Sequence, residues 1–143
     1  MKREGEIRIP SGCAIAAVIS KEGRRMDGGG IIRAMIPMHE RSNGLGGGFA
    51  GYGIYPEFRD FFALHLFFDD SAARKSCEQF LKDHFEIVHD EKIPTRTIPA
   101  ITGEPIIRRY FVAPLKSVLA AQQVDEREYV DRTVMRINSQ IPG

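Results

Sequence analysis

The sequence carries almost no excess charge and no long apolar run. Lys and Arg number 20 against 19 Asp and Glu, so the formal net charge is only +1. No overall basic field exists to concentrate nucleic acid or anionic lipid, and we expect neither as a partner. The longest apolar run, Cys13–Ile19, falls well short of the ~20 residues that a membrane helix requires. We therefore expect a soluble, cytoplasmic protein with no membrane partner.

Cysteine is also scarce. The two cysteines, Cys13 and Cys77, stand far apart and match neither a disulfide scaffold nor a metal-knuckle spacing. Cys77 shares the apolar face of a predicted helix, so we expect it in the core. Three histidines lie on predicted strand or helix faces without a nearby cysteine or paired carboxylates: His65, His84 and His89. His39, at a helix end, is more typical of a structural role. We predict no metal and no cofactor.

The chain has a single-domain length and no internal repeat. Residues 1–12 are charged and end in proline, serine and glycine, which predicts a leader or arm ahead of a domain over 13–143. Cys13–Ile19 is continuously apolar and is closed by the polar turn Ser20–Gly23. That pattern is typical of a central strand buried on both faces.

Apolar residues at helical spacing after Gly30 predict a helix that faces a sheet, and Pro37 must kink or shorten it. The glycine-rich stretch Asn43–Gly48 tolerates positive φ and would end that helix. Phe49–Tyr55 then predicts a strand that forms a hairpin with the aromatic-rich strand Phe61–Phe68.

The second half of the sequence predicts a strand-helix-strand unit in an α+β fold. Asp70 or Ser71 can cap a helix, and Phe85–His89 reads as the strand that follows it. Ile106–Val112 predicts a further strand, and Asp125–Gln140 an amphipathic helix. Because side chains alternate along a strand, we expect either Arg108 or Arg109 to face solvent or a partner.

Cys13 is the first candidate for chemistry. A cysteine that becomes a chain terminus carries its own base, because its α-amine, with a pKa near ~8, can take the thiol proton. Removal of residues 1–12 would create such a terminus. The alternative is a buried structural thiol, since free cysteine is among the most buried residue types.

A second element is the segment Met38–Ala50, in which an arginine and several glycines fill the turn between a helix and a strand. Gly46, Gly47 and Gly48 would leave room for a neighbouring strand, while Arg41 could anchor a carboxylate or backbone oxygens. The alternative is an ordinary helix C-cap with a tight turn. No Gly-Lys-Ser/Thr follows, so the segment does not match a phosphate-binding loop.

These two segments, Cys13–Ile19 and Met38–Tyr55, together resemble the opening of a class II glutamine amidotransferase. The chain most resembles the glutaminase subunit of archaeal-type glutamate synthases, and Glu128–Asn138 is similar to a later segment of that subunit. The resemblance implies an N-terminal-nucleophile-hydrolase-like fold, a partial αββα sandwich with the cysteine at the end of a central strand.

The resemblance also implies a reaction and its residues. A thiolate attacks the side-chain amide of glutamine, ammonia leaves, and water hydrolyses the γ-glutamyl thioester. Cys13 matches the nucleophile, and Arg41, Gly47 and Gly48 match substrate-binding positions, where Arg41 holds the surroundings of the nucleophile. The implied partners are glutamine as substrate and a glutamate synthase subunit.

Two departures from the family pattern shape the expectation. Ala14 stands where the family usually has glycine. The oxyanion Asn-Gly pair and the strand with the substrate-binding arginine lie downstream in such proteins, and Asn138 here is followed by Ser139. We therefore expect the N-terminal part of a glutaminase domain, which acts with the remaining part of that domain. The alternative is a non-catalytic interaction module that pairs strands with another chain or forms a homo-oligomer.

Overall fold

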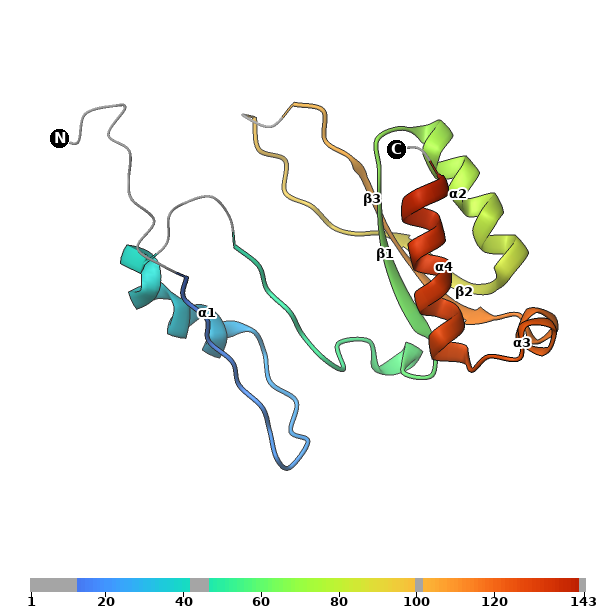
Figure 1. Ribbon diagram of the computed structural model, residues 1–143. Coiled ribbons are helices and arrows are strands. Elements are labelled where there is room, and N and C mark those ends of the chain that lie inside the picture. The colour runs from blue at the N-terminus through green and yellow to red at the C-terminus, as the bar shows by residue number, and fades with distance from the viewer. Residues whose placement is uncertain (1–12, 42–46, 100–101, 142–143) are drawn as a thin grey trace. The chain divides into compact units, whose positions relative to one another are not determined.

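The computed structural model describes residues 13–41, 47–99 and 102–141. The chain divides into two compact units, Met1–Tyr52 and Gly53–Gly143. The predicted leader, residues 1–12, lies outside the described residues, as do residues 43–46 of the predicted helix end at 43–48. Figure 1 follows the elements along the chain by colour.

The first unit contains one short helix and little other regular structure. Helix α1 spans Gly29–Met35, and a 3-10 helix, η1, follows over Ile36–Arg41. Pro37 has no N–H to donate to the preceding turn, so the α-helix ends just before it, as predicted. None of the residues of α1 is buried, and Ile32 and Ile36 are exposed. The predicted sheet-facing helix thus forms, but its apolar side chains are not covered.

The predicted central strand Cys13–Ile19 is wrong for this structure. The segment has no regular secondary structure, and Ile15 and Ile19 are 90% and 89% exposed. A strand needs a neighbour for its N–H and C=O groups, and within the described ranges no other segment pairs with this run. The turn after it does form, since the Gly23 N–H donates to the Ser20 carbonyl over 3.3 Å.

The second unit is built on an antiparallel sheet of three strands in the order β1-β3-β2. Its strands are β1 (Phe62–Phe68), β2 (Phe85–Lys92) and β3 (Ile106–Pro114). The predicted hairpin between Phe49–Tyr55 and β1 is wrong, because the first of these segments forms no strand. Gly53 there has φ +68°, a conformation that interrupts a strand, and β1 pairs with β3 instead.

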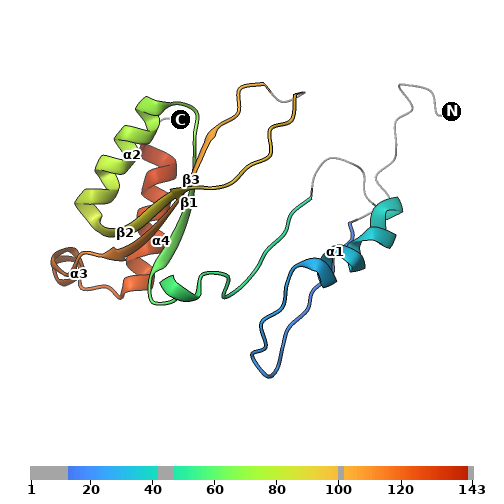
Figure 2. The same ribbon diagram turned by 180° about the vertical axis from the view of Figure 1, so that it is seen from behind.

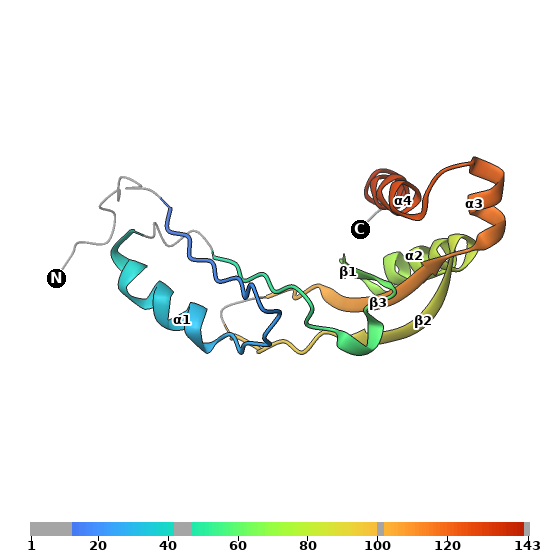
Figure 3. The ribbon, with the colours of Figure 1, turned by 90° about the horizontal axis from the view of Figure 1, so that it is seen from below.

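Two helices, α2 (Ser71–His84) and α4 (Glu126–Gln140), cover one face of the sheet, as Figures 1 and 3 show. Both begin where the sequence predicts. The Asp70 carboxylate accepts hydrogen bonds from the N–H groups of Ala72 and Ala73, each over 2.8 Å, and Asp125 accepts from Glu128 over 2.9 Å. Short polar side chains therefore fix both helix starts.

Helix α3 (Lys116–Gln122) was not predicted from the sequence. Its N-cap is Leu115, which makes no side-chain cap hydrogen bond, and Gln123 ends it at φ 52°. Neither end carries the usual signals, an Asp, Asn, Ser or Thr before the helix and a glycine after it. Along the chain α3 lies between β3 and α4, and Figure 2 shows it beyond the end of β3.

The core lies between the sheet and its two helices. Cys77 and Leu81 of α2 pack with strand residues and with α4, and Cys77 is fully buried, as predicted. The buried cluster is completed by Leu64, Phe68, Ala73, Phe85, Tyr110, Val112, Tyr129, Val130 and Ile137. The α+β class and the strand-helix-strand unit β1-α2-β2 are thus confirmed. In the described part of the chain there is one sheet, so the second sheet of an αββα sandwich remains a prediction.

Candidate functional site

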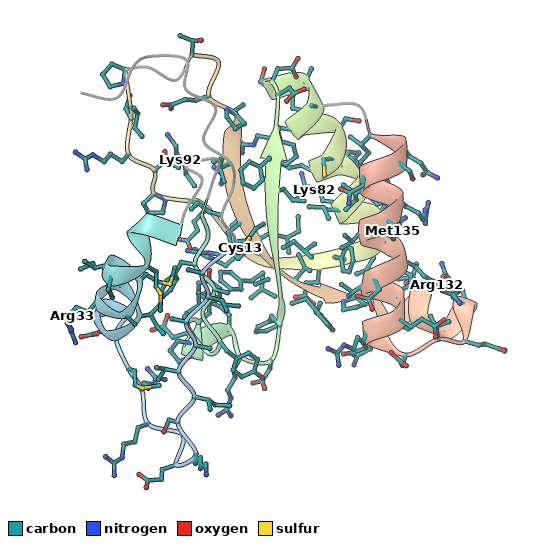
Figure 4. All side chains as sticks on the ribbon, turned by 60° about the vertical axis from the view of Figure 1, so that its left-hand side comes forward. Cys13, Arg33, Lys82, Lys92, Arg132 and Met135 are labelled. Carbon is teal, nitrogen blue, oxygen red and sulfur yellow. The ribbon has the colours of Figure 1, made fainter. Side chains whose placement is uncertain are left out.

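The two cysteines differ sharply in accessibility. Cys13 is exposed, on the irregular segment that precedes α1 (Figure 4), so its thiol is open to reagents and to substrates. Cys77 is fully buried in α2, and burial, with a smaller contribution from Glu78, raises the pKa of its thiol to about 11. Because a thiolate is the reactive form, Cys77 is inert at neutral pH and Cys13 is the candidate nucleophile.

The other three predicted site residues also belong to the first unit. The backbone of Arg41 ends η1, and its side chain lies outside the described residues. Gly47 and Gly48 are exposed, and no described atom lies within 4 Å of where a Cβ would stand on either. The structure therefore does not bring Cys13 into close contact with these two glycines, and their role in substrate binding stays a prediction.

The second unit holds a cluster of ion pairs that sequence reasoning missed. Arg109 donates from Nε and Nη2 to Oε1 of Glu91, over 3.0 and 2.5 Å, while Arg108 pairs with Asp90. Both arginine side chains are about 15% exposed. The expectation that one of them faces solvent or a partner is therefore wrong, because each meets an acidic residue of β2. Successive residues point to opposite faces of the sheet, so the two pairs lie on different faces.

Tyr55 and His65 extend the pair formed by Arg109. The guanidinium donates from Nη1 to the Tyr55 hydroxyl over 2.5 Å and lies 4.3 Å from the centre of the tyrosine ring. The same hydroxyl lies 3.1 Å from Nε2 of His65. Burial, followed by the charge of Arg109, lowers the pKa of His65, which favours the neutral imidazole. In the tautomer that carries its proton on Nδ1, Nε2 accepts a hydrogen bond from the Tyr55 hydroxyl.

The surroundings of Arg109 raise the pKa of its guanidinium, which stays charged. Burial alone would lower its pKa, but the hydrogen bonds to Glu91 and Tyr55 outweigh burial and raise it. All three of its donor nitrogens have partners within this cluster. Three of the five N–H donors of the guanidinium are therefore engaged within the cluster.

Aromatic rings complete this face of the sheet. Phe58 lies flat over Phe111, with ring centres 3.9 Å apart, and over His89, at 5.2 Å. Tyr55 meets Phe111 edge to face at 5.1 Å. Phe111 is consequently only 1% exposed, although it points away from the two covering helices. The segment 55–58 is thus a small cover for the second face, bordered by a hollow of about 440 Å³.

Neither a metal centre nor a membrane span is found in the part of the chain that the structure describes. No group of three or more His, Cys, Asp or Glu side chains is placed there to hold a metal ion. No helix among those residues is long and apolar enough to cross a bilayer.

Comparison with known proteins gives one informative match. The chain is 42% identical over 131 residues to a protein of Archaeoglobus fulgidus that is described as uncharacterized. The alignment covers 90% of this chain but 34% of the relative, so the chain spans about a third of that protein's length. No family model matches the chain, and no solved structure matches it.

Proposed function

We propose that this chain is the nucleophile-bearing part of a glutamine amidotransferase domain that releases ammonia from glutamine for glutamate synthesis. The observation that carries the proposal is the exposed thiol of Cys13 at the head of an apolar run, followed in the sequence by the arginine- and glycine-containing segment Met38–Tyr55. The Archaeoglobus fulgidus relative supports it, because this chain spans about a third of that protein. The remainder of such a protein has room for the oxyanion and substrate-binding elements that the proposed domain requires.

The proposed chemistry is acyl transfer to sulfur. The Cys13 thiolate adds to the side-chain amide carbon of glutamine, the C–N bond breaks, and the nitrogen leaves as ammonia after taking up a proton. Water then breaks the C–S bond of the thioester, which gives glutamate and restores the thiol. If residues 1–12 are removed, the new α-amine takes the thiol proton in the first step.

The exposed apolar run fits this proposal. Ile15, Val18 and Ile19 are all exposed, and apolar side chains in a continuous run are usually covered in a working protein. In the fold that the resemblance implies, this run would be the central strand of a sheet. We infer that the run becomes a strand when the rest of the domain supplies neighbouring strands.

The test uses an electrophilic diazoketone analogue of glutamine on the natural protein isolated from its host. We expect one adduct on Cys13, found by peptide mass spectrometry, that excess glutamine prevents. Cys77 is an internal control, because it is buried and should stay unlabelled. Labelling of neither thiol, or labelling that glutamine does not prevent, would contradict the proposal.

The mass of the isolated protein shows whether residues 1–12 have been removed, and it therefore tests whether the α-amine of Cys13 can act as the base. Loss of residues 1–12 supports it, whereas an intact leader on a protein that still hydrolyses glutamine excludes it. Cys13→Ala should abolish hydrolysis, and Cys77→Ala should leave it in place.

The alternative function is a non-catalytic interaction module. It is favoured by a different observation: the outer edge of β1 in the second unit pairs with no further strand among the described residues. Under this alternative, Cys13→Ala would leave partner binding and folding intact.

A further inference from the structure

Strand β1 forms one edge of the sheet, and this edge is unprotected. Among the described residues β1 pairs with β3 alone, so its outer N–H and C=O groups have no strand beside them. Its seven residues, Phe62–Phe68, include no Asp, Glu, Lys or Arg. Soluble proteins usually blunt a free edge with charges, proline or a bulge, because such an edge readily pairs with another chain.

The opposite edge, β2, is protected in these ways. Its register with β3 shifts between Ile87 and His89, which is a bulge or similar irregularity. It also carries charged side chains along its length: Glu86, Asp90, Glu91 and Lys92. Of the two edges, β1 is therefore the one whose composition and regular register favour pairing with a further strand.

The sequence of β1 indicates that a second copy of the same strand is a suitable pairing partner. Phe-Ala-Leu-His-Leu-Phe-Phe is nearly symmetric about His65, with leucine on each side and phenylalanine at both ends. If a second copy ran antiparallel with a two-fold axis at His65, Leu64 would face Leu66 and Phe62 would face Phe68 of the second copy. Two-fold pairing requires this kind of self-complementary surface.

Burial along β1 agrees with this register. Leu64 and Phe68 are buried beneath the helices, while Ala63, His65 and Phe67 point to the other face and are exposed. In the paired strands Phe67, now 63% exposed, would lie opposite the small Ala63 of the second copy. Large and small side chains would thus meet on the exposed face, and branched and aromatic ones on the core face.

We propose that two copies of this chain associate through β1, antiparallel and in register at His65, so that their two three-stranded sheets become one continuous sheet. The helices of both copies then lie on the same face. A hollow of about 320 Å³ runs beside the edge, lined in part by Leu66, Phe68, Ile137 and Ile141, and the dimer would cover it. This inference is independent of glutamine hydrolysis.

The absence of charged side chains along β1 favours the pairing of two copies. His65 is the one titratable residue of β1, and two copies would meet at the axis. Burial and the neighbouring Arg109 lower the pKa of His65, so both imidazoles are uncharged at neutral pH. No like charges therefore oppose one another along the strand.

Sedimentation analysis of the full chain over a range of concentrations tests the dimer. We expect a species of twice 16.1 kDa. Phe67→Lys, at an exposed position, should raise the dissociation constant at least about tenfold, because edge lysines oppose strand pairing. Val88→Lys, at a 41% exposed position on β2, is the matched control and should leave association unchanged. A monomeric wild type, or equal effects of both variants, would overturn the proposal.

Disulfide trapping tests the register. In a Cys13→Ser background, Ala63→Cys and Phe67→Cys would lie opposite each other across the two-fold axis, within reach of a disulfide. Each variant alone would place its own two thiols four residues apart, roughly 14 Å, which is too far. We therefore expect cross-linking when the two variants are mixed and none in either alone. Cross-linking of either alone, or none in the mixture, would exclude this register.

Discussion

The hydroxyl of Tyr110 on β3 donates a hydrogen bond to Oε1 of Glu78 on α2, over 2.8 Å. Arg74, one turn earlier on α2, donates to the same oxygen from Nε over 2.7 Å. Burial alone would raise the pKa of Glu78, but these two hydrogen bonds outweigh it and lower the pKa. A carboxylate that stays charged therefore joins the helix to the central strand of the sheet.

Tyr110→Phe should destabilise the protein. The change leaves the ring in place and removes one hydrogen bond to a charged group, worth ~1.5–3 kcal/mol. Tyr129→Phe is the matched control, because Tyr129 is equally buried, at 1% exposed, and its hydroxyl has no partner among the described residues. Urea unfolding should show a loss for the first variant and none for the second. A similar loss for both would mean that the bond to Glu78 contributes nothing specific.

Alkaline pH should weaken the fold through two buried groups. Burial, reinforced by Glu78, raises the pKa of Tyr110 to about 12 and that of Cys77 to about 11. The unfolded chain releases these protons at the lower, ordinary pKa values, so it binds fewer protons than the folded protein at high pH. The free energy of unfolding should thus be unaffected at neutral pH and fall between about pH 9 and 12. Urea unfolding at a series of pH values measures this slope.

Two substitutions test how much Cys77 and Tyr110 each contribute to the fall in the free energy of unfolding at alkaline pH. Cys77→Ala should flatten the lower part of the fall, because the thiol is the group that titrates first. Tyr110→Phe should flatten the upper part. If both variants retained the wild-type slope, other groups would control alkaline unfolding.

Most elements of the second unit could be predicted because their signals are local. The spacing of apolar residues and the caps Asp70 and Asp125 locate α2 and α4 within a residue of their observed starts. The run Cys13–Ile19 could not be placed in this way. Its composition is that of a buried strand, but strand formation depends on a neighbour elsewhere in the chain, and hydrophobicity does not say which segment that is.

The ion pairs of the sheet were also not predicted, because they depend on which strands pair and in which register. Arg109 and Glu91 are 18 residues apart, and they meet because β2 and β3 pair in a particular register. The sequence did contain a signal, adjacent arginines in one strand and the adjacent acids Asp90 and Glu91 near another. It was missed because the predicted strand ended at His89, whereas β2 continues to Lys92. With three more residues in this strand, both arginines have an acidic partner, including the one that was expected to face solvent or a partner.

Glu91→Ala should destabilise the second unit by about 1–2 kcal/mol, because it leaves the mostly buried Arg109 with Tyr55 as its remaining partner. The expected loss is at or below the low end of the range for charged hydrogen bonds, since the Glu91 side chain is itself 39% exposed and solvent weakens the pair. Glu86→Ala, on the exposed face of the same strand, is the control and should cost little. Unfolding by urea at pH 7 measures both, and equal losses would argue against the pair.

Asp70→Ala should remove the N-cap of α2 and cost about 1 kcal/mol. Two N–H groups at the helix start lose their acceptor, since Asp70 Oδ1 accepts from both Ala72 and Ala73. Asp69→Ala removes the same charge one residue earlier, without a cap, so it separates capping from the attraction of the helix dipole for acids. Asp70→Asn keeps an acceptor oxygen and should recover most of the loss. Helix α2 supplies Cys77 and Leu81 to the core, so the loss should appear in the cooperative unfolding of the whole second unit. Fraying of the helix start alone, with unchanged stability of the unit, would show that capping and core packing are uncoupled.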